Sequence, residues 1–173
     1  MGGELLHYLK DRGRMTEVIA RHIILQVIQA MLYCHSRGVV HRDLKLENVL
    51  FKSQDFEDDN FTVKVVDFGI AGMANDKVDA GTLSYMAPEC LEKVAAETTP
   101  AIDVWAIGVM FYAMVFGELP FSSRNEKDLV KSIKHDPVKF PKDIPITDEG
   151  KEVISSMLNK DPKKRIELLE FVN

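Results

Sequence analysis

A nearly unbroken apolar helix is the feature that most constrains the fold of this chain. Residues 101–116 read AIDVWAIGVMFYAMVF and are apolar almost all round, not on one face only. A helix of this composition is buried in a domain or crosses a membrane. The longest uninterrupted apolar run, residues 104–116, has 13 residues, short of the roughly 20 that a membrane span needs. We therefore expect the central helix of a globular domain, ended by Gly117, and no membrane partner.

The length, charge and cysteine content agree with one globular domain. The chain has 173 residues, 46% of them hydrophobic and 28% charged, which suits one sizeable domain with its own core. The net charge of -5 makes nucleic acid an unexpected partner and suits a basic substrate. Cys34 and Cys90 are far apart and form no CxxC motif, which predicts reduced thiols in an intracellular, cytoplasmic chain.

The rest of the chain reads as a mainly α-helical domain with one small β-hairpin. Residues 67–89 show no sustained period, so we expect an ordered, irregular segment that carries function. The expected strands are 49–51 and 62–66, joined by an acidic tip at 55–59. The expected helices are 4–12, 17 to about 37, 101–116, 125–134 and 147–158, with a last helix that begins near Arg165 and is cut short at Asn173.

An eight-residue motif carries the chemistry. Residues 41–48 read HRDLKLEN and match the pattern H-R-D-L-x-x-x-N without a gap. Phosphoryl transfer from ATP needs a carboxylate to accept the proton of the attacking hydroxyl, a cation on the γ-phosphate and oxygen ligands for Mg²⁺. Asp43, Lys45 and Asn48 supply one of each. The alternative, an ordinary polar loop between a helix and a strand, leaves the complete string unexplained.

Two further motifs follow in a fixed order. Asp67, Phe68 and Gly69 come directly after a predicted strand, and a carboxylate at that place is the hard oxygen ligand that Mg²⁺ prefers. Residues 87–89, Ala-Pro-Glu, close the segment that Asp67 opens. Independent motifs in this order make the assignment specific.

With these motifs the chain resembles a eukaryotic serine/threonine protein kinase, and the resemblance covers essentially all of its length. It implies a protein-kinase-like fold of which residues 1–173 are a partial domain. This part is the C-terminal lobe only, beginning at the hinge, without the small lobe. The implied activity is transfer of the ATP γ-phosphate to Ser or Thr hydroxyls of proteins. Because catalysis by positioning needs both lobes, we expect the isolated chain to bind ATP weakly and to turn over little.

The resemblance also implies roles for individual residues. Asp43 is the catalytic base, Lys45 contacts the γ-phosphate, and Asn48 and Asp67 hold the Mg²⁺ ions. Thr82, in the GTLSY stretch at 81–85, resembles the pattern of serine/threonine kinases when taken together with Lys45. The expected catalytic residues are thus Asp43, Lys45, Asn48 and Thr82.

Binding of ATP and of the protein substrate is implied at other positions. Glu4, in the opening GGEL, corresponds to a residue that reaches the ATP ribose, a basic substrate residue, or both. Leu50 corresponds to the apolar floor under the adenine ring. Glu4 and Glu47 are the candidate anchors for an arginine upstream of the target residue, whereas Ala113 stands where strongly arginine-directed relatives carry another glutamate. The full set expected to bind ATP is Glu4, Lys45, Glu47, Asn48, Leu50 and Asp67.

Three residues are expected to support the site without doing chemistry. Glu89 resembles a carboxylate that pairs with a late arginine, here Arg165. Asp103 resembles a buried aspartate that hydrogen-bonds the backbone of the catalytic loop. That role is physically sensible, because a buried carboxylate must be paired or hydrogen-bonded.

The GGEL opening, the HRDLKLEN loop, the long hairpin tip and the YMAPE stretch together resemble calcium/calmodulin-dependent and calcium-dependent protein kinases. That group implies a protein substrate with basic residues upstream of the target, and regulation by calcium or calmodulin outside this chain. The competing hypothesis is a catalytically inactive remnant that serves as a protein-binding module. Degenerate kinases lose the base or the metal ligands, and both are present here, which favours an active enzyme.

The segment between Gly69 and Gly81 contains no Ser, Thr or Tyr. The phosphate that pairs with the catalytic-loop arginine in many kinases has no acceptor there. We therefore predict activation without phosphorylation of this segment, with Asp76 or Asp79 neutralising Arg42.

Overall fold

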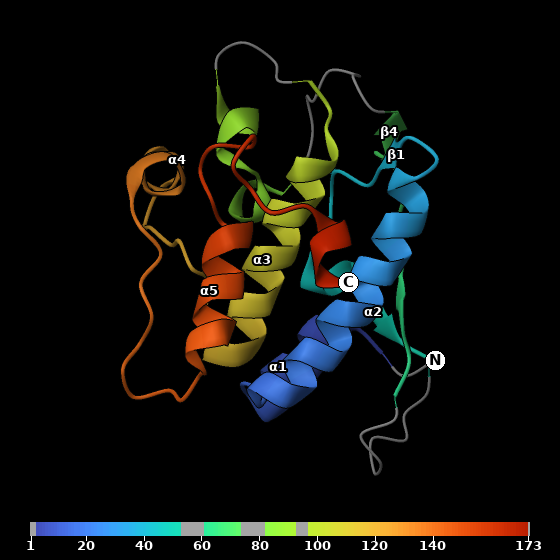
Figure 1. Ribbon diagram of the computed structural model, residues 1–173. Coiled ribbons are helices and arrows are strands. Elements are labelled where there is room, and N and C mark those ends of the chain that lie inside the picture. The colour runs from blue at the N-terminus through green and yellow to red at the C-terminus, as the bar shows by residue number, and fades with distance from the viewer. Residues whose placement is uncertain (1–2, 53–60, 74–81, 93–96, 173) are drawn as a thin grey trace.

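The computed structural model describes residues 3–52, 61–73, 82–92 and 97–172 (Figure 1). These residues are mainly α-helical, as the sequence predicted, and contain two small antiparallel sheets. The elements, in chain order, are α1 (Leu5–Arg12), α2 (Glu17–His35), β1 (Val39–Val40), η1 (Leu46–Asn48), β2 (Val49–Phe51), β3 (Val63–Val65), β4 (Gly72–Met73), η2 (Leu83–Tyr85), η3 (Pro88–Leu91), α3 (Pro100–Phe116), α4 (Glu126–His135), α5 (Asp148–Met157) and η4 (Leu168–Phe171), where η marks a 3₁₀-helix.

Helix α3 is the centre of the core, which confirms the prediction made for residues 101–116. It packs between α2 and α5 (Figure 1), and it is buried on every side from Ile102 to Phe116. Pro100 stands in its first turn, where the missing N–H costs nothing. Gly117 ends the helix in the left-handed conformation, with φ of 73°, and its N–H donates to the carbonyl of Ala113. A residue with a Cβ is disfavoured at such a cap.

Helix α2 lies against α3 through one apolar face. Its N-terminus is capped as expected, because the Thr16 hydroxyl accepts a hydrogen bond from the N–H of Ile19. By length and composition alone this 19-residue helix also meets the requirement for a membrane span. Core helices of globular domains meet the same requirement, and the buried residues of α2 all belong to the common core: Ala20, Ile23, Ile24, Val27, Ile28 and Met31.

The predicted hairpin is present as β2 and β3, with Val49 opposite Val65 and Phe51 opposite Val63. Its expected tip at 55–59 lies outside the described residues. Helix α2 holds the hairpin through Gln26. The amide of Gln26 donates to the carbonyl of Phe61 over 3.0 Å and accepts the N–H of Val63 over 2.9 Å. The strand that leads to Asp67 is thereby fixed to the core.

A second sheet was not predicted. Strands β1 and β4 pair antiparallel, with Val39 opposite Met73 and Val40 opposite Gly72. Residues 67–89 are therefore not irregular throughout, since they also contain η2 and part of η3. Two-residue strands produce no measurable alternation, and their pairing partners are far apart in sequence, so sequence patterns could not show them.

The prediction of a last helix beginning near Arg165 was wrong. Residues 162–164 form turns, residue 165 a bend, and only the short 3₁₀-helix η4 follows. Arg165 is drawn inward by its hydrogen bonds to Glu89 and to the carbonyl of Ala101. Glu167 then adopts an extended conformation and exchanges capping hydrogen bonds with Glu170, which starts the helical turn after it.

Candidate active site

Residues 41–48, the predicted catalytic loop, are hydrogen-bonded to a buried carboxylate on α3. Asp103 is fully buried and accepts the backbone N–H of His41 and that of Arg42, each over 2.9 Å. It also bonds the His35 ring nitrogen at 2.8 Å. These contacts confirm the expected scaffolding role of Asp103. The His35 contact was missed, because a partner 68 positions away leaves no local signal.

The backbone is strained at two places beside the site, one in the loop of residues 41–48 and one after strand β3. Arg42 and Asp67 have φ of 69° and 64°, and they are the non-glycine residues of the described chain with positive φ. Such conformations cost energy and persist where the surroundings impose them, as they do at many functional sites. At Arg42 the imposing group is the carboxylate of Asp103.

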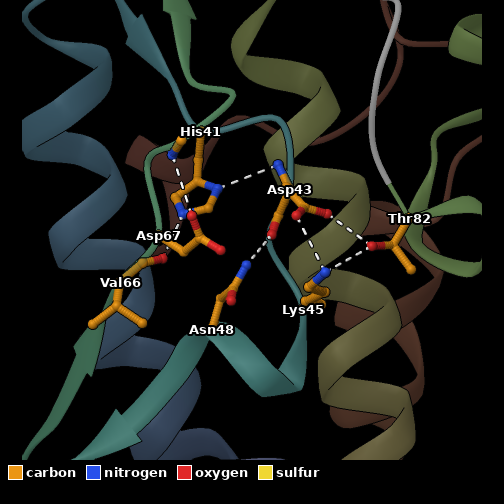
Figure 2. Close-up of polar contacts among 8 residues, drawn as sticks. His41, Asp43, Lys45, Asn48, Val66, Asp67 and Thr82 are labelled. Atoms are coloured by element: carbon orange, nitrogen blue, oxygen red, sulfur yellow. Dashed lines mark hydrogen bonds and ion pairs between the residues drawn. The ribbon is translucent and has the colours of Figure 1, made fainter.

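Three predicted catalytic residues meet in one polar cluster (Figure 2). The Thr82 hydroxyl donates to Asp43 Oδ1 over 2.9 Å, and Lys45 Nζ donates to the same hydroxyl over 2.9 Å. Lys45 Nζ also lies 3.2 Å from Asp43 Oδ2. Both carboxylate oxygens of Asp43 are thus bound by side chains that come from two different segments of the chain.

His41 fixes the backbone that carries Asp43. Its Nδ1 accepts the N–H of Asp43 over 3.2 Å, so the proton of a neutral ring lies on Nε2, which donates to the carbonyl of Val66 over 3.0 Å. The ring also contacts Phe68, with centroids 4.5 Å apart. One imidazole therefore links the catalytic loop to the segment that carries Asp67.

Asn48 and Asp67, the residues predicted to hold the metal, both lie beside the cluster. Asn48 Nδ2 donates to the carbonyl of Asp43 over 2.8 Å, which leaves its side-chain oxygen available. Asp67 is exposed, and its Oδ1 accepts the N–H of Gly69 over 3.3 Å. In Figure 2 these two side chains lie beside one another, next to Asp43.

This donor set fits Mg²⁺. Within the described part of the chain, no group of three or more His, Cys, Asp and Glu side chains is placed to hold a metal ion. An amide oxygen and one carboxylate are instead what Mg²⁺ commonly takes from a protein, because it keeps several waters and binds substrate phosphates.

Two predicted ATP-binding residues are brought together by the backbone. Glu4 and Leu50 form an isolated antiparallel bridge, and the carbonyl of Gly3 accepts the N–H of Phe51 over 3.0 Å. Glu4 is exposed and Leu50 is half-buried. The start of the chain is thus held against strand β2, next to the catalytic loop.

Glu47 lies in η1 with one carboxylate oxygen unsatisfied. Its Oε2 is buried and has no hydrogen-bond partner among the described residues. Burial, and after it the charge of Glu47, raise the pKa of the Tyr85 hydroxyl. A buried carboxylate oxygen without a partner is costly, and a cationic ligand would remove that cost.

The predicted pair of Glu89 and Arg165 is confirmed. Arg165 Nη1 and Nη2 donate to the two carboxylate oxygens over 2.7 and 2.9 Å, a bidentate geometry of the strong kind. The arginine side chain is fully buried, and it also donates to the carbonyls of Ala101 and Asn159. This pair thereby attaches the segment that follows Thr82 to the segment around Arg165, near the C-terminus.

Asp76 and Asp79, the predicted partners of Arg42, lie outside the described residues. The described partner of the Arg42 side chain is the carbonyl of Ile70, to which Nε donates over 2.5 Å. This contact was not predicted, since nothing in the sequence shows that a backbone carbonyl faces the guanidinium.

Comparison with known proteins agrees with this geometry. The chain is 38% identical over 176 residues to the "Cell cycle serine/threonine-protein kinase CDC5/MSD2" of Saccharomyces cerevisiae, covering 99% of this chain and 24% of that protein. It is 40% identical over 174 residues to the "Carbon catabolite-derepressing protein kinase" of Secale cereale, covering 98% and 33%. It is 36% identical over 173 residues to the "SNF1-related protein kinase catalytic subunit alpha KIN12" of Arabidopsis thaliana, covering 98% and 33%.

The chain therefore spans about a quarter to a third of the length of these relatives. The family model described as "Protein kinase domain" matches residues 1–173. Proteins of that family use ATP and Mg²⁺. This chain belongs to the protein kinase domain family.

Proposed function

We propose that this chain carries the phosphotransfer site of a protein serine/threonine kinase, which moves the γ-phosphate of ATP to Ser or Thr hydroxyls of protein substrates. The observation that carries the proposal is the binding of both Asp43 oxygens by Lys45 and Thr82. A carboxylate held in this way is oriented before the substrate arrives, and orientation is the larger part of phosphoryl-transfer catalysis.

Asp43 orients the attacking hydroxyl and accepts its proton. Lys45 supplies positive charge where the transferred phosphate becomes most negative, and Thr82 restrains the Asp43 and Lys45 side chains relative to each other. Asn48 and Asp67 would hold Mg²⁺. The metal, when bound, neutralises the phosphate charge that develops during transfer.

Nucleotide and substrate are assigned to neighbouring surfaces. Leu50 lies under the adenine ring and Glu4 at the ribose, and the bridge between these two residues supports that assignment. Glu47 anchors a basic residue upstream of the target, supported by its unsatisfied oxygen. The net charge of -5 also favours basic substrates.

The finer assignment is to the calcium/calmodulin-dependent and calcium-dependent group, with residues 1–173 forming the C-terminal lobe of the kinase domain. The motifs of the sequence support this placement. Regulation by calcium or calmodulin then acts through regions outside this chain.

A single substitution tests the proposed reaction. Asp43→Asn keeps the shape of the side chain and removes the base, so phosphate transfer from ATP to Ser peptides with an upstream arginine should fall by about 10²–10⁴-fold. The assay uses the full-length protein, with Asp148→Asn as control, since that side chain is 96% exposed. Equal activity of the Asp43→Asn variant would contradict the proposal, and absence of transfer by the unmodified protein would favour the binding module.

A further inference from the structure

We propose that Gly72 is a positioning residue for phosphoryl transfer. Because it has no Cβ, the guanidinium of Arg42 can lie against strand β4 and hold the catalytic loop without a phosphate on the segment that follows. The inference rests on the proposed kinase function. Gly72 lies outside the catalytic motifs.

The space at Gly72 is filled by one side chain. A Cβ built on Gly72 would lie 2.5 Å from Cζ of Arg42 and 2.7 Å from each of its Nη atoms. Those atoms are the end of a flexible side chain, so a methyl group would displace the guanidinium and leave the backbone where it is.

Glycine is needed here for room and not for backbone conformation. The glycines with positive φ in the described chain are Gly3, Gly13, Gly38 and Gly117. Gly72 is not among them, and it pairs with Val40 as an ordinary strand residue. An alanine can therefore adopt the same backbone conformation, which makes the substitution a clean probe of the guanidinium.

With the guanidinium at this place, Arg42 is held through its side chain as well as through its backbone. The backbone N–H of Arg42 is bound by Asp103, and its Nε donates to the carbonyl of Ile70 over 2.5 Å. The residue is strained, with φ of 69°, and such a conformation persists only where the surroundings impose it. Fixing both ends of Arg42 fixes the next residue, Asp43, which carries the reacting carboxylate.

The sequence excludes one kind of partner for Arg42 on the segment that follows. Between Gly69 and Thr82 the chain has no Ser, Thr or Tyr, so no phosphate can be placed on that stretch to bind Arg42. A charge-assisted hydrogen bond to a main-chain carbonyl is permanent and needs no modifying enzyme. Ile70 provides that carbonyl, two residues before strand β4, which is itself paired with β1.

The first readout is independent of catalysis. In the ¹⁵N-labelled protein, the Nε–Hε signal of Arg42, assigned by its loss in Arg42→Ala, should be shifted and slow to exchange with water. Gly72→Ala should move it to the position of solvent-exposed arginines, while the thermal unfolding midpoint shows that the variant is folded. Met73→Leu, on the same strand at a side chain 55% exposed, should leave the signal unchanged.

The second readout is kinetic. In the full-length protein Gly72→Ala should lower kcat on the order of tenfold, the effect of one charge-assisted hydrogen bond, with the KM for ATP unchanged. In an Arg42→Ala background the same substitution should have no further effect.

The outcomes separate the two proposals. A retained Nε–Hε signal, an unchanged kcat, or an equal loss of kcat with and without Arg42 would each overturn the role of Gly72. If the signal behaves as expected but the unmodified protein transfers no phosphate, the contact between Gly72 and Arg42 stands. The proposed kinase function, and the catalytic role of Gly72 with it, is then overturned.

Discussion

The backbone N–H of Arg42 donates a 2.9 Å hydrogen bond to Oδ1 of Asp103, a carboxylate fully buried on the central helix. This one contact joins the most apolar element of the fold to the most polar loop. It also explains why a charged residue is placed in an otherwise apolar helix. The carboxylate satisfies two backbone groups that would otherwise be unpaired in the interior.

Replacement of Asp103 by asparagine should disrupt both stability and catalysis. One amide NH₂ would then face a backbone N–H, which leaves a buried donor unsatisfied at about 1–3 kcal/mol. The free energy of unfolding, measured by urea denaturation, should fall by that amount, and kcat should fall with it. Asp148→Asn, on the surface, should change neither, and an equal effect of the two substitutions would contradict this explanation.

Thr82→Val should separate catalysis from folding. Valine keeps the shape and removes the hydroxyl that bridges Lys45 and Asp43. We expect kcat to fall on the order of tenfold, with unfolding free energy changed by less than about 1 kcal/mol. Thr82→Ser should retain most activity because it retains the hydroxyl. Thr62 is exposed, so Thr62→Val serves as the matched control. An equal loss of activity in Thr62→Val would show that the effect does not depend on the Thr82 hydroxyl.

The pair of Glu89 and Arg165 should be necessary for folding. Arg165→Met leaves the Glu89 carboxylate without its bidentate partner, and breaking a buried pair costs about 3–5 kcal/mol. The double variant Glu89→Gln, Arg165→Met should recover part of that loss. A double-mutant cycle in guanidinium chloride measures both values, and strictly additive losses would show that the two side chains are not coupled.

Gly108→Ala should change the stability of the fold in two opposite ways, through helix propensity and through packing. Alanine favours a helix by about 0.5–1 kcal/mol over glycine, but overpacking costs about 1–3 kcal/mol. The new Cβ would lie 2.8 Å from Cβ of Met157 and 3.0 Å from Cδ2 of Leu158. We expect net destabilisation, seen as a lower denaturation midpoint at an unchanged m-value. A stabilised variant would mean that α3 and α5 can separate more easily than their packing indicates.

The thiol of Cys90 should be unreactive in the folded chain. Burial, and after it the charge of Glu89, raise its pKa from 9.0 to about 12. The thiolate is the reactive form, so at pH 8 alkylation by iodoacetamide should be ~100-fold or more slower than in the unfolded chain. Peptide mapping by mass spectrometry separates Cys90 from Cys34.

The same pKa shift sets the sign of a pH effect on stability. Between pH 9 and about 12 the folded chain keeps the Cys90 proton that the unfolded chain has lost. The folded state then binds more protons, so the contribution of Cys90 to stability decreases as pH rises through that window. Cys90→Ala should remove this part of the alkaline loss, and an identical pH profile for the variant would contradict the shift.

The sequence by itself determined which residues make up the candidate site and where the long helices lie. The eight-residue loop at 41–48 and the DFG motif are local strings, and helices α2 to α5 follow from apolar spacing and from caps such as Thr16 and Thr147. These signals lie within a few residues of the structure that they specify, so they can be read without the fold.

Only the tertiary structure decided how these parts are held together. The pairing of β1 with β4, the contact of His35 with Asp103 and the place of Arg42 against Gly72 all join segments distant in sequence. A hydrogen bond between such segments depends on the packing of the whole core, and no local pattern encodes it. For the same reason the end of the chain was mispredicted as a helix, since burial of Arg165 against Glu89 outweighs its local helical preference.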